Sequence, residues 1–310
     1  MYPPRETSTP RAPRGPWLSW RQLRLACAGF LAVLLLGGCV VRVVYNQLDW
    51  LALWYVEDYF DLDASQEQLA RDMIGRTLSW HRETQLPQYA GLTRSMLAGS
   101  APPVDPAFLA ARYADVVTLW DGFLIQVTPD LAVLLRSLSD EQVESLFANL
   151  ARDNEELAED FSGVTAAERR AKQDKSIIRA FRRFTGRLTS AQEVLVRTRT
   201  ARFHDLSADW LSRRAAWQAE FRRLLDGRRT DPAFEQRLGR LLLNPDQFDG
   251  PGYRELVEQN RRASFALVAV VLDSLSADQR RHLDGRLTTF AEDFEALVRS
   301  GGDKRNDEAT

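Results

Sequence analysis

The chain has 310 residues, of which 45% are hydrophobic and 27% are charged, and its formal net charge is -2. This length suits one large or two modest domains, and the hydrophobic content is enough for a substantial core, so the chain is not disordered as a whole. The near-neutral total argues against a general affinity for polyanions, and we expect no nucleic-acid partner. Both cysteines, Cys27 and Cys39, lie in the first 40 residues. The remainder can therefore hold no disulfide framework and no cysteine-based metal site.

The N-terminal segment has the features of a lipoprotein signal peptide in the usual order. Arginines precede an apolar run from Leu25 to Leu36. A run of about a dozen residues matches the apolar region of a signal peptide and is short of the ~20 that cross a bilayer. The run ends in Leu36-Gly37-Gly38-Cys39, which resembles the bacterial lipobox. The resemblance implies that residues 1–38 are a signal peptide cleaved after Gly38 and that Cys39 is lipidated. The alternative is an N-terminal anchor helix that happens to contain a cysteine.

Lipidation at Cys39 would determine the cellular location of the protein. Several acyl chains on one residue anchor a protein stably, whereas a single chain is marginal. The next residue is Val40 and not the Asp that retains enterobacterial lipoproteins in the inner membrane. We therefore expect a lipid-anchored protein on the periplasmic side of the outer membrane, with the membrane as its first partner.

Helix signals run through the mature chain, and no segment alternates polar and apolar residues as a strand would. Residues 39–61 predict an apolar helix with a narrow polar strip. Further helix starts are predicted at Asp105-Pro106, Thr128-Pro129 and Asp231-Pro232, each a capping residue followed by proline. The predicted fold class is all-α, an elongated multi-helix bundle of long capped helices.

A five-residue motif occurs four times: Leu, a capping residue, two further residues and Gln. Its copies are at 62–66, 138–142, 188–192 and 275–279. The Asp, Ser or Thr side chain accepts hydrogen bonds from the first-turn amides, and the Gln reaches back to the amide of the cap. Each copy therefore predicts a helix that starts in the same way.

The motif spacing hints at an internal duplication. Leu62 lies 43 residues before the sequence DPAF at Asp105, and Leu188 lies 43 residues before a second DPAF at Asp231. We therefore predict two related helical halves, although chance recurrence of helix-start signals remains an alternative. The predicted segments after the N-terminal helix are 62–162 (first half), 163–187 (basic connecting helix), 188–299 (second half) and 300–310 (disordered tail).

Charge is distributed unevenly between the two halves. Residues 41–163 contain 8 Arg and 20 Asp or Glu, a net charge of -12, and residues 165–240 contain 19 Arg or Lys and 9 Asp or Glu, a net charge of +10. The two parts could attract each other, the charges could be ordinary solvated helix faces, or the basic part could bind an anion. The candidate residues for anion or partner binding are Arg169, Arg170, Lys172, Lys175, Arg179, Arg182 and Arg183.

No catalytic residue, metal site or cofactor is predicted. The three histidines, His81, His204 and His282, show no metalloprotease spacing, and nucleophile-elbow and phosphate-loop patterns are absent. Pro87 is expected to kink or break its helix. Side chains near this kink could form a cleft, or they could be an aromatic core around a hydrogen-bonded histidine. The possible cleft residues are Trp80, His81, Arg82, Tyr89 and Asp58.

Several short strings after the lipobox together resemble a family of proteobacterial lipoproteins that is a domain of unknown function. They are Tyr45-Asn46, Asp49-Trp50, Trp54, Asp58-Tyr59-Phe60-Asp61-Leu62, Trp80-His81-Arg82, Leu86-Pro87 and Tyr89-Ala90. The likeness covers residues 36–95 and implies a signal-anchored helical lipoprotein without naming an activity. The repeated caps also look like the Leu-Thr-x-x-Gln motif of small periplasmic stress chaperones, which would imply binding of partly unfolded clients or stress sensing.

These observations favour a non-enzymatic binding or scaffold protein of the cell envelope. Its partner would be an envelope protein or an anionic lipid, and the basic helix at 165–186 would be the contact surface. One alternative is a chaperone-like or stress-sensing periplasmic protein with a concave apolar face. Another is an envelope lipid or glycan enzyme that uses His81 and nearby carboxylates.

Overall fold

The computed structural model describes residues 39–308. The predicted signal peptide lies outside the described residues. Every regular element in the described range is helical, which confirms the all-α fold class. In chain order the elements are α2 (Cys39–Tyr45), α3 (Leu48–Phe60), α4 (Ala64–Trp80), the π-helical turn η1 (His81–Gln85), α5 (Leu86–Gly99), α6 (Pro106–Ser137), α7 (Asp140–Ser162), α8 (Ala166–Thr185), α9 (Ser190–Thr200), α10 (Ser207–Asp226), α11 (Phe234–Leu243), the 3-10 turn η2 (Pro245–Phe248), α12 (Tyr253–Asp273) and α13 (Ala277–Glu308).

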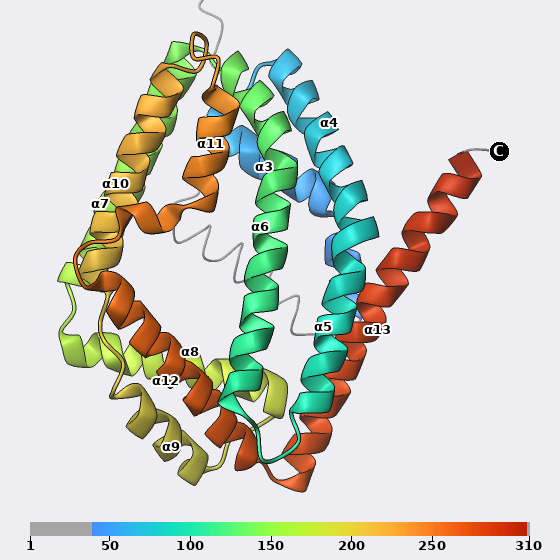
Figure 1. The fold of residues 1–310 in the computed structure, drawn as a ribbon, viewed down its shortest axis with the longest axis vertical. Helices are drawn as coiled ribbons and strands as arrows, with labels where there is room; N and C mark the ends of the chain where they lie inside the picture. The colour runs from blue at the N-terminus through green and yellow to red at the C-terminus, as the bar shows by residue number, and fades with distance from the viewer. Residues whose placement is uncertain (1–38, 309–310) are drawn as a thin grey trace, which may run out of the picture.

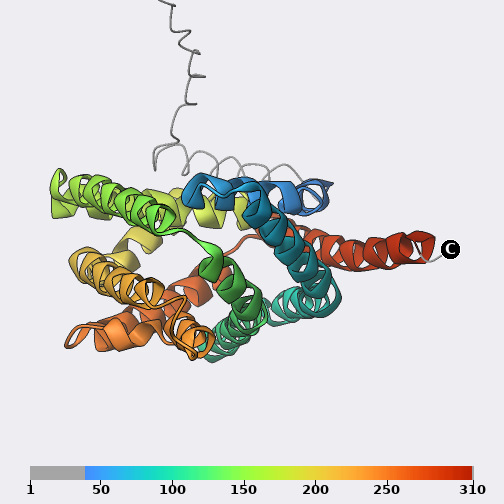
Figure 2. The same ribbon diagram turned by 90° about the horizontal axis from the view of Figure 1, so that it is seen from above.

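The helices are arranged as a flattened ring (Figures 1 and 2). In Figure 1, α6 runs down the middle of the view, α7 and α10 lie together on the left, and α4, α5 and α13 form the right side. The helices α8, α9 and α12 close the lower end. The last turns of α13 project away from the body in both views. The sequence predicted a tail without structure from residue 300, whereas α13 runs to Glu308.

The largest core cluster joins α6, α7, α10 and α11. Leu138, Leu225, Phe234 and Leu238 are completely buried in it. Burying one such side chain contributes roughly 1.5–3 kcal/mol, so this cluster is a major source of stability. Leu138 is also the leucine of the second copy of the repeated motif, so the start of α7 packs directly on this core cluster.

All four predicted helix starts have the expected capping chemistry. The first three, before α4, α7 and α9, show the reciprocal capping box between the cap residue and the Gln. Before α13, the Ser276 amide donates to Oε1 of Gln279 (3.0 Å) and the Gln279 amide donates to Oγ of Ser276 (3.2 Å). The motif therefore satisfies exposed first-turn amides in each case.

The motif glutamines also pair with one another, which the sequence did not predict. Nε2 of Gln66 donates to Oε1 of Gln142 (3.0 Å) and to the backbone carbonyl of Ser137 (2.8 Å). Nε2 of Gln142 donates in return to Oε1 of Gln66 (2.6 Å) and to the carbonyl of Asp61 (2.8 Å). The starts of α4 and α7 are thus fastened to each other.

Gln192 and Gln279 repeat this arrangement in the second half. Each donates to the amide oxygen of the other at 2.9 Å. Gln192 also donates to the carbonyl of Ser274 (3.0 Å), and Gln279 to that of Arg187 (2.8 Å). In all four cases the accepting carbonyl belongs to the residue just before the leucine of the partner motif.

Helix packing also matches between the halves. The helix α3 packs on α4 and α7, just as α8 packs on α9 and α13. The contact of α4 with α6 corresponds to that of α9 with α12, and the contact of α5 with α13 corresponds to that of α10 with α7. The two parts of the chain are therefore alike in their glutamine pairs and in these helix contacts, with α8 in the position that corresponds to α3. The internal duplication itself stays a prediction.

Four local predictions differ from the structure. Asp231-Pro232 does not start α11, because this helix begins at Phe234 with Ala233 as its N-cap. Thr128-Pro129 does not start a helix, because α6 runs through Pro129 and the hydroxyl of Thr128 donates to the carbonyl of Leu124 (2.6 Å) inside the helix. Pro87 does not break its helix either, because the π-helical turn η1 precedes it and the chain stays helical. The apolar segment at 39–61 forms two helices, α2 and α3, separated by a turn at residues 46–47.

Among the described helices, α6 alone is long and apolar enough to cross a membrane, and 17% of its most apolar window is buried. Length and composition are the only basis for this assignment. The contacts of α6 with α4, α5, α11 and α12 fit a helix that belongs to the body of the fold.

The glutamine pairs should make a measurable contribution to stability. Replacing Gln66 by Ala removes its bonds to Gln142 and Ser137 and leaves partly buried groups unpaired, at up to about 1–3 kcal/mol for each such group. We expect the free energy of unfolding in urea to fall by about 2 kcal/mol or more. Gln68→Ala is the matched control, because Gln68 is exposed on the same helix and bonds only to Asp72. Equal losses in both variants would show that the pairing is not stabilising.

Candidate functional site

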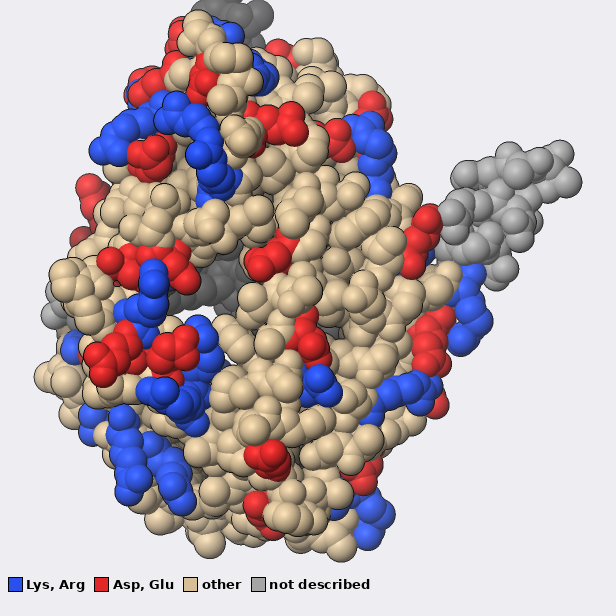
Figure 3. Space-filling view, in the orientation of Figure 1, with Lys and Arg blue, Asp and Glu red and all other residues tan. Residues whose placement is uncertain are grey.

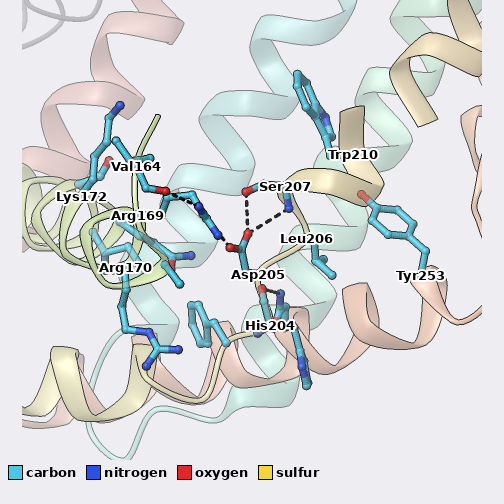
Figure 4. Close-up of a pocket in the computed structure, with 16 residues that line it drawn as sticks. Val164, Arg169, Arg170, Lys172, His204, Asp205, Leu206, Ser207, Trp210 and Tyr253 are labelled. Atoms are coloured by element: carbon cyan, nitrogen blue, oxygen red, sulfur yellow. Dashed lines mark hydrogen bonds and ion pairs between the residues drawn. The ribbon is translucent and has the colours of Figure 1, made fainter. Parts of the chain in front are cut away.

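The N-terminal half of α8 forms one wall of a cleft of about 630 Å³. The opposite walls come from the connection between α9 and α10 at residues 203–206, from the first turns of α10, and from α12 (Figure 4). A capping box fixes the start of α8, because Glu168 accepts hydrogen bonds from both the amide (2.7 Å) and the hydroxyl (2.9 Å) of Thr165. The cleft lies within the size range of ordinary small-molecule sites.

Arg169 points into the cleft but is paired. Its Nε donates to Oδ2 of Asp205 (2.9 Å), and its NH1 donates to the carbonyl of Val164 (2.8 Å). The hydroxyl and amide of Ser207, and after them Arg169, hold the pKa of Asp205 below its ordinary value. Asp205 is therefore ionised at neutral pH and offsets the charge of Arg169.

Arg170 and Lys172 line the same cleft. They carry the positive charge that remains after Asp205 offsets the charge of Arg169. Both side chains are exposed, and no ion pair involves them in the part of the chain that the structure describes. Figure 4 shows them extending on either side of Arg169. Two cations beside a cleft with apolar and aromatic walls are suited to an anion with an apolar part.

The other predicted basic residues do not line this cleft. Lys175 and Arg179 are exposed on the outer face of α8, and Arg182 forms an ion pair with Glu193. Arg183 is half-buried, and its Nε has no hydrogen-bond partner in the described structure. The predicted basic surface is therefore divided, with Arg169, Arg170 and Lys172 in the cleft and the other four residues outside it.

Among the described side chains, the oppositely charged parts form ion pairs at α10 and in the turn after it. Arg222 pairs with Glu144 through a 3.2 Å hydrogen bond, and buried Arg228 donates to Asp140 (2.5 Å). The helix α8 packs instead on α9 and α13, which belong to the second half.

Several cleft residues were not predicted as candidates. The amide of His204 donates to Oδ1 of Asn260 (2.8 Å), and Nδ2 of Asn260 donates to the carbonyl of His204 (2.9 Å). These bonds fasten the α9–α10 connection to α12. Trp210 and Tyr253 add aromatic surface to the cleft. They come from separate helices, so no local sequence pattern could have grouped them.

The predicted cleft around His81 is an aromatic cluster. Nδ1 of His81 lies 2.9 Å from the hydroxyl of Tyr45, and its ring contacts Tyr89 and Phe123 at centroid distances of 5.4 Å and 6.5 Å. Arg82 lies over the ring of Tyr45 at 5.2 Å. Half-buried Trp80 ends α4 just before this turn. The structure therefore favours the aromatic-core interpretation.

The enzyme hypothesis needs His81 to lie beside a carboxylate. Among the described side chains, no carboxylate is hydrogen-bonded to His81, and the side chain of Asp58 lies outside the described residues. No group of three or more possible metal ligands occurs among the described residues. General acid–base chemistry needs such groups within hydrogen-bond reach of each other and of a substrate.

The predicted lipidation residue begins the first helix. Cys39 is the first residue of α2, and its side chain lies outside the described residues. The helix α2 packs on α13 through Val41 and Tyr45. Nε of Arg42 also donates to Oδ1 of buried Asp293 on α13 (3.0 Å). The chain just after Cys39 is therefore fixed to the body of the fold.

Burial of His81 should make stability depend on pH. Burial lowers the pKa of His81 from its ordinary value of 6.5, so the folded chain resists protonation of this ring. Its contribution to stability is complete above the unfolded pKa and is lost as the pH falls through the lower folded pKa. We expect His81→Gln to reduce the loss of unfolding free energy between about pH 7.5 and about pH 5. A pH profile of the His81→Gln variant that is identical to that of the unchanged chain would contradict the assignment.

Comparison with protein families found a match to a family of unknown function (DUF6279) over residues 58–254. The match includes the cleft residues of α8 and Tyr253, and it leaves out the segment around Cys39. Comparisons with curated proteins and with solved structures found no match. Because the family model spans more than half of the chain, the protein belongs to this family of unknown function.

Proposed function

We propose that the chain is a periplasmic lipoprotein anchored in the outer membrane through Cys39, and that it is a non-enzymatic protein that binds an anionic envelope component in the α8 cleft. The observation that carries the binding role is the pair of exposed cations, Arg170 and Lys172, on a cleft of about 630 Å³. A cleft of this size with two positive charges and aromatic walls can enclose a small anion better than an open basic face can.

The surface next to Cys39 supports the membrane placement. Val43 and Trp50 are 61% and 64% exposed, and Tyr55 on the same helix as Trp50 is also exposed. Aromatic side chains with an apolar body and a polar edge are favoured at membrane interfaces. An anchor at Cys39 would bring these residues close to the lipid head groups.

The apolar face of α6 favours the chaperone-like alternative. Tyr113, Val116, Val117 and Trp120 are exposed at spacings that place them on one side of the helix. Figure 3 shows a largely uncharged surface over α6, beside a hollow rimmed by charged side chains. Such a face could hold apolar segments of a client. The cleft nevertheless supports the anion-binding role better, because it combines shape with charge.

The anchor can be tested with the two cysteines. Cys39→Ser removes the thiol that is proposed to carry the lipid. The signal peptide should then stay uncleaved, so the protein should keep its precursor size, and partitioning into the detergent phase that is due to the acyl chains should be lost. Electrophoresis and Triton X-114 phase separation of cell extracts measure both properties. Cys27→Ser is the control and should behave as the unchanged chain, because Cys27 lies in the predicted signal peptide. Identical behaviour of all three proteins would rule out lipidation at Cys39.

Anion binding can be tested with trisulfonated hydroxypyrene, an anionic dye without an alkyl chain. The full-length mature protein is held in phosphatidylcholine nanodiscs, and binding is followed by fluorescence anisotropy. A hydrogen bond to a charged group contributes about 1.5–3 kcal/mol. Arg170→Gln combined with Lys172→Gln should therefore weaken binding by about tenfold or more. Lys175→Gln combined with Arg179→Gln removes the same charge from the outer face of α8 and should change the affinity little. Equal effects of the two double variants would show that the cleft is not the site.

A further inference from the structure

We propose that the anion bound in the α8 cleft is the head group of a single-chain lipid, such as a fatty acid, whose acyl chain occupies a second cavity behind α8. This inference rests on the proposed function, because it names the ligand class of the same cleft. It goes further in assigning a separate apolar site.

The second cavity has a volume of about 410 Å³ and lies between α8, α12 and α13. Its walls are apolar side chains, among them Phe181, Phe184, Leu267, Val268 and Leu287. The volume is at the lower end of the range for small-molecule sites, which suits one extended chain better than two.

The hydroxyl groups around this cavity are occupied by their own helices. Ser100 donates to the carbonyl of Leu97 (3.0 Å), Thr185 to that of Phe181 (2.9 Å), and Ser264 to that of Asn260 (2.8 Å). No charged residue lines the cavity. A ligand in it would meet apolar surface almost throughout, as a hydrocarbon chain requires.

The apolar cavity adjoins the basic cleft. Ile177 and Phe203 line both of them. Along α8, residues 166–177 contribute to the cleft and residues 177–185 to the apolar cavity. The two sites therefore follow one another along the same helix, with cations at one end and hydrocarbon-like walls at the other.

The dimensions also fit a lipid chain. Eight residues separate Ile177 from Thr185, which is about 12 Å along a helix axis. One leaflet of a bilayer core is about 15 Å thick. An acyl chain that enters beside Ile177 can therefore lie along the C-terminal half of α8, while its head group stays within reach of Arg170 and Lys172.

The test uses a dansyl-labelled eleven-carbon fatty acid as the probe and the full-length mature protein in phosphatidylcholine nanodiscs, with empty nanodiscs as background. Ala180 is exposed and Ser264 is half-buried, and both line the apolar cavity. Ala180→Trp and, as a second variant, Ser264→Trp should fill the cavity and lower fatty-acid affinity at least tenfold. Both should leave binding of the trisulfonated dye unchanged. Circular dichroism and thermal melting check that each variant is folded.

The charge variants complete the experiment. Arg170→Gln with Lys172→Gln should weaken fatty-acid binding, and Lys175→Gln with Arg179→Gln should not. Displacement of the probe by palmitate or by lysophosphatidic acid supports a single-chain ligand and identifies a carboxylate or a phosphate as its head group. Displacement only by two-chain phosphatidylglycerol overturns the inference.

Failure of this inference can be told apart from failure of the proposed function. Unchanged fatty-acid binding in both folded tryptophan variants overturns the acyl-chain site, even where the dye still binds the cleft. Unchanged affinity for the trisulfonated dye in the Arg170→Gln, Lys172→Gln double variant overturns the proposal that the cleft binds anions.

Discussion

Reciprocal hydrogen bonds between glutamine side chains join the four motif helices in two pairs at their N-termini. Each Gln caps its own helix and also donates to its partner Gln and to the carbonyl before the partner motif. A buried amide that lacks these partners would be costly, so the four helix starts must meet in pairs. Two such pairs fix which helices pack together in each half.

The second pair also positions the candidate site. Gln279 donates to the carbonyl of Arg187. The residue before Arg187 is Gly186, which ends α8 and has a positive backbone φ of 75°. Glycine tolerates this positive φ better than other residues, so the end of α8 is sharply defined. Thr165 and Glu168 define the other end through the capping box. A helix held at both ends can keep one face toward α12 and leave a groove along it.

Local chemistry was predictable from the sequence, and long-range pairing was not. The caps, the glycine after α8 and the basic character of this helix follow from neighbouring residues, and the structure contains all three. Thr128-Pro129 was misjudged because a buried, hydrogen-bonded Thr inside α6 has the same local sequence as a helix start. The cleft could not be predicted, since Trp210, Tyr253 and Asn260 come together only through tertiary packing. Which cations remain unpaired depends likewise on Asp205 and Glu193, which lie outside α8.

The packing correspondence between α3 and α8 suggests how one helical unit could acquire two roles. Both helices precede a motif helix and pack on the two helices whose starts are joined by a glutamine pair. The sequence of α3 is mostly aromatic and aliphatic, and it leaves Trp50 exposed. The sequence of α8 instead carries cations on one side and lines an apolar cavity on another. The glutamine pairs and buried leucines hold the scaffold in both halves, so the exposed faces of these two helices can differ without loss of the fold. One face then suits contact with a membrane surface, and the other suits enclosure of an anionic molecule.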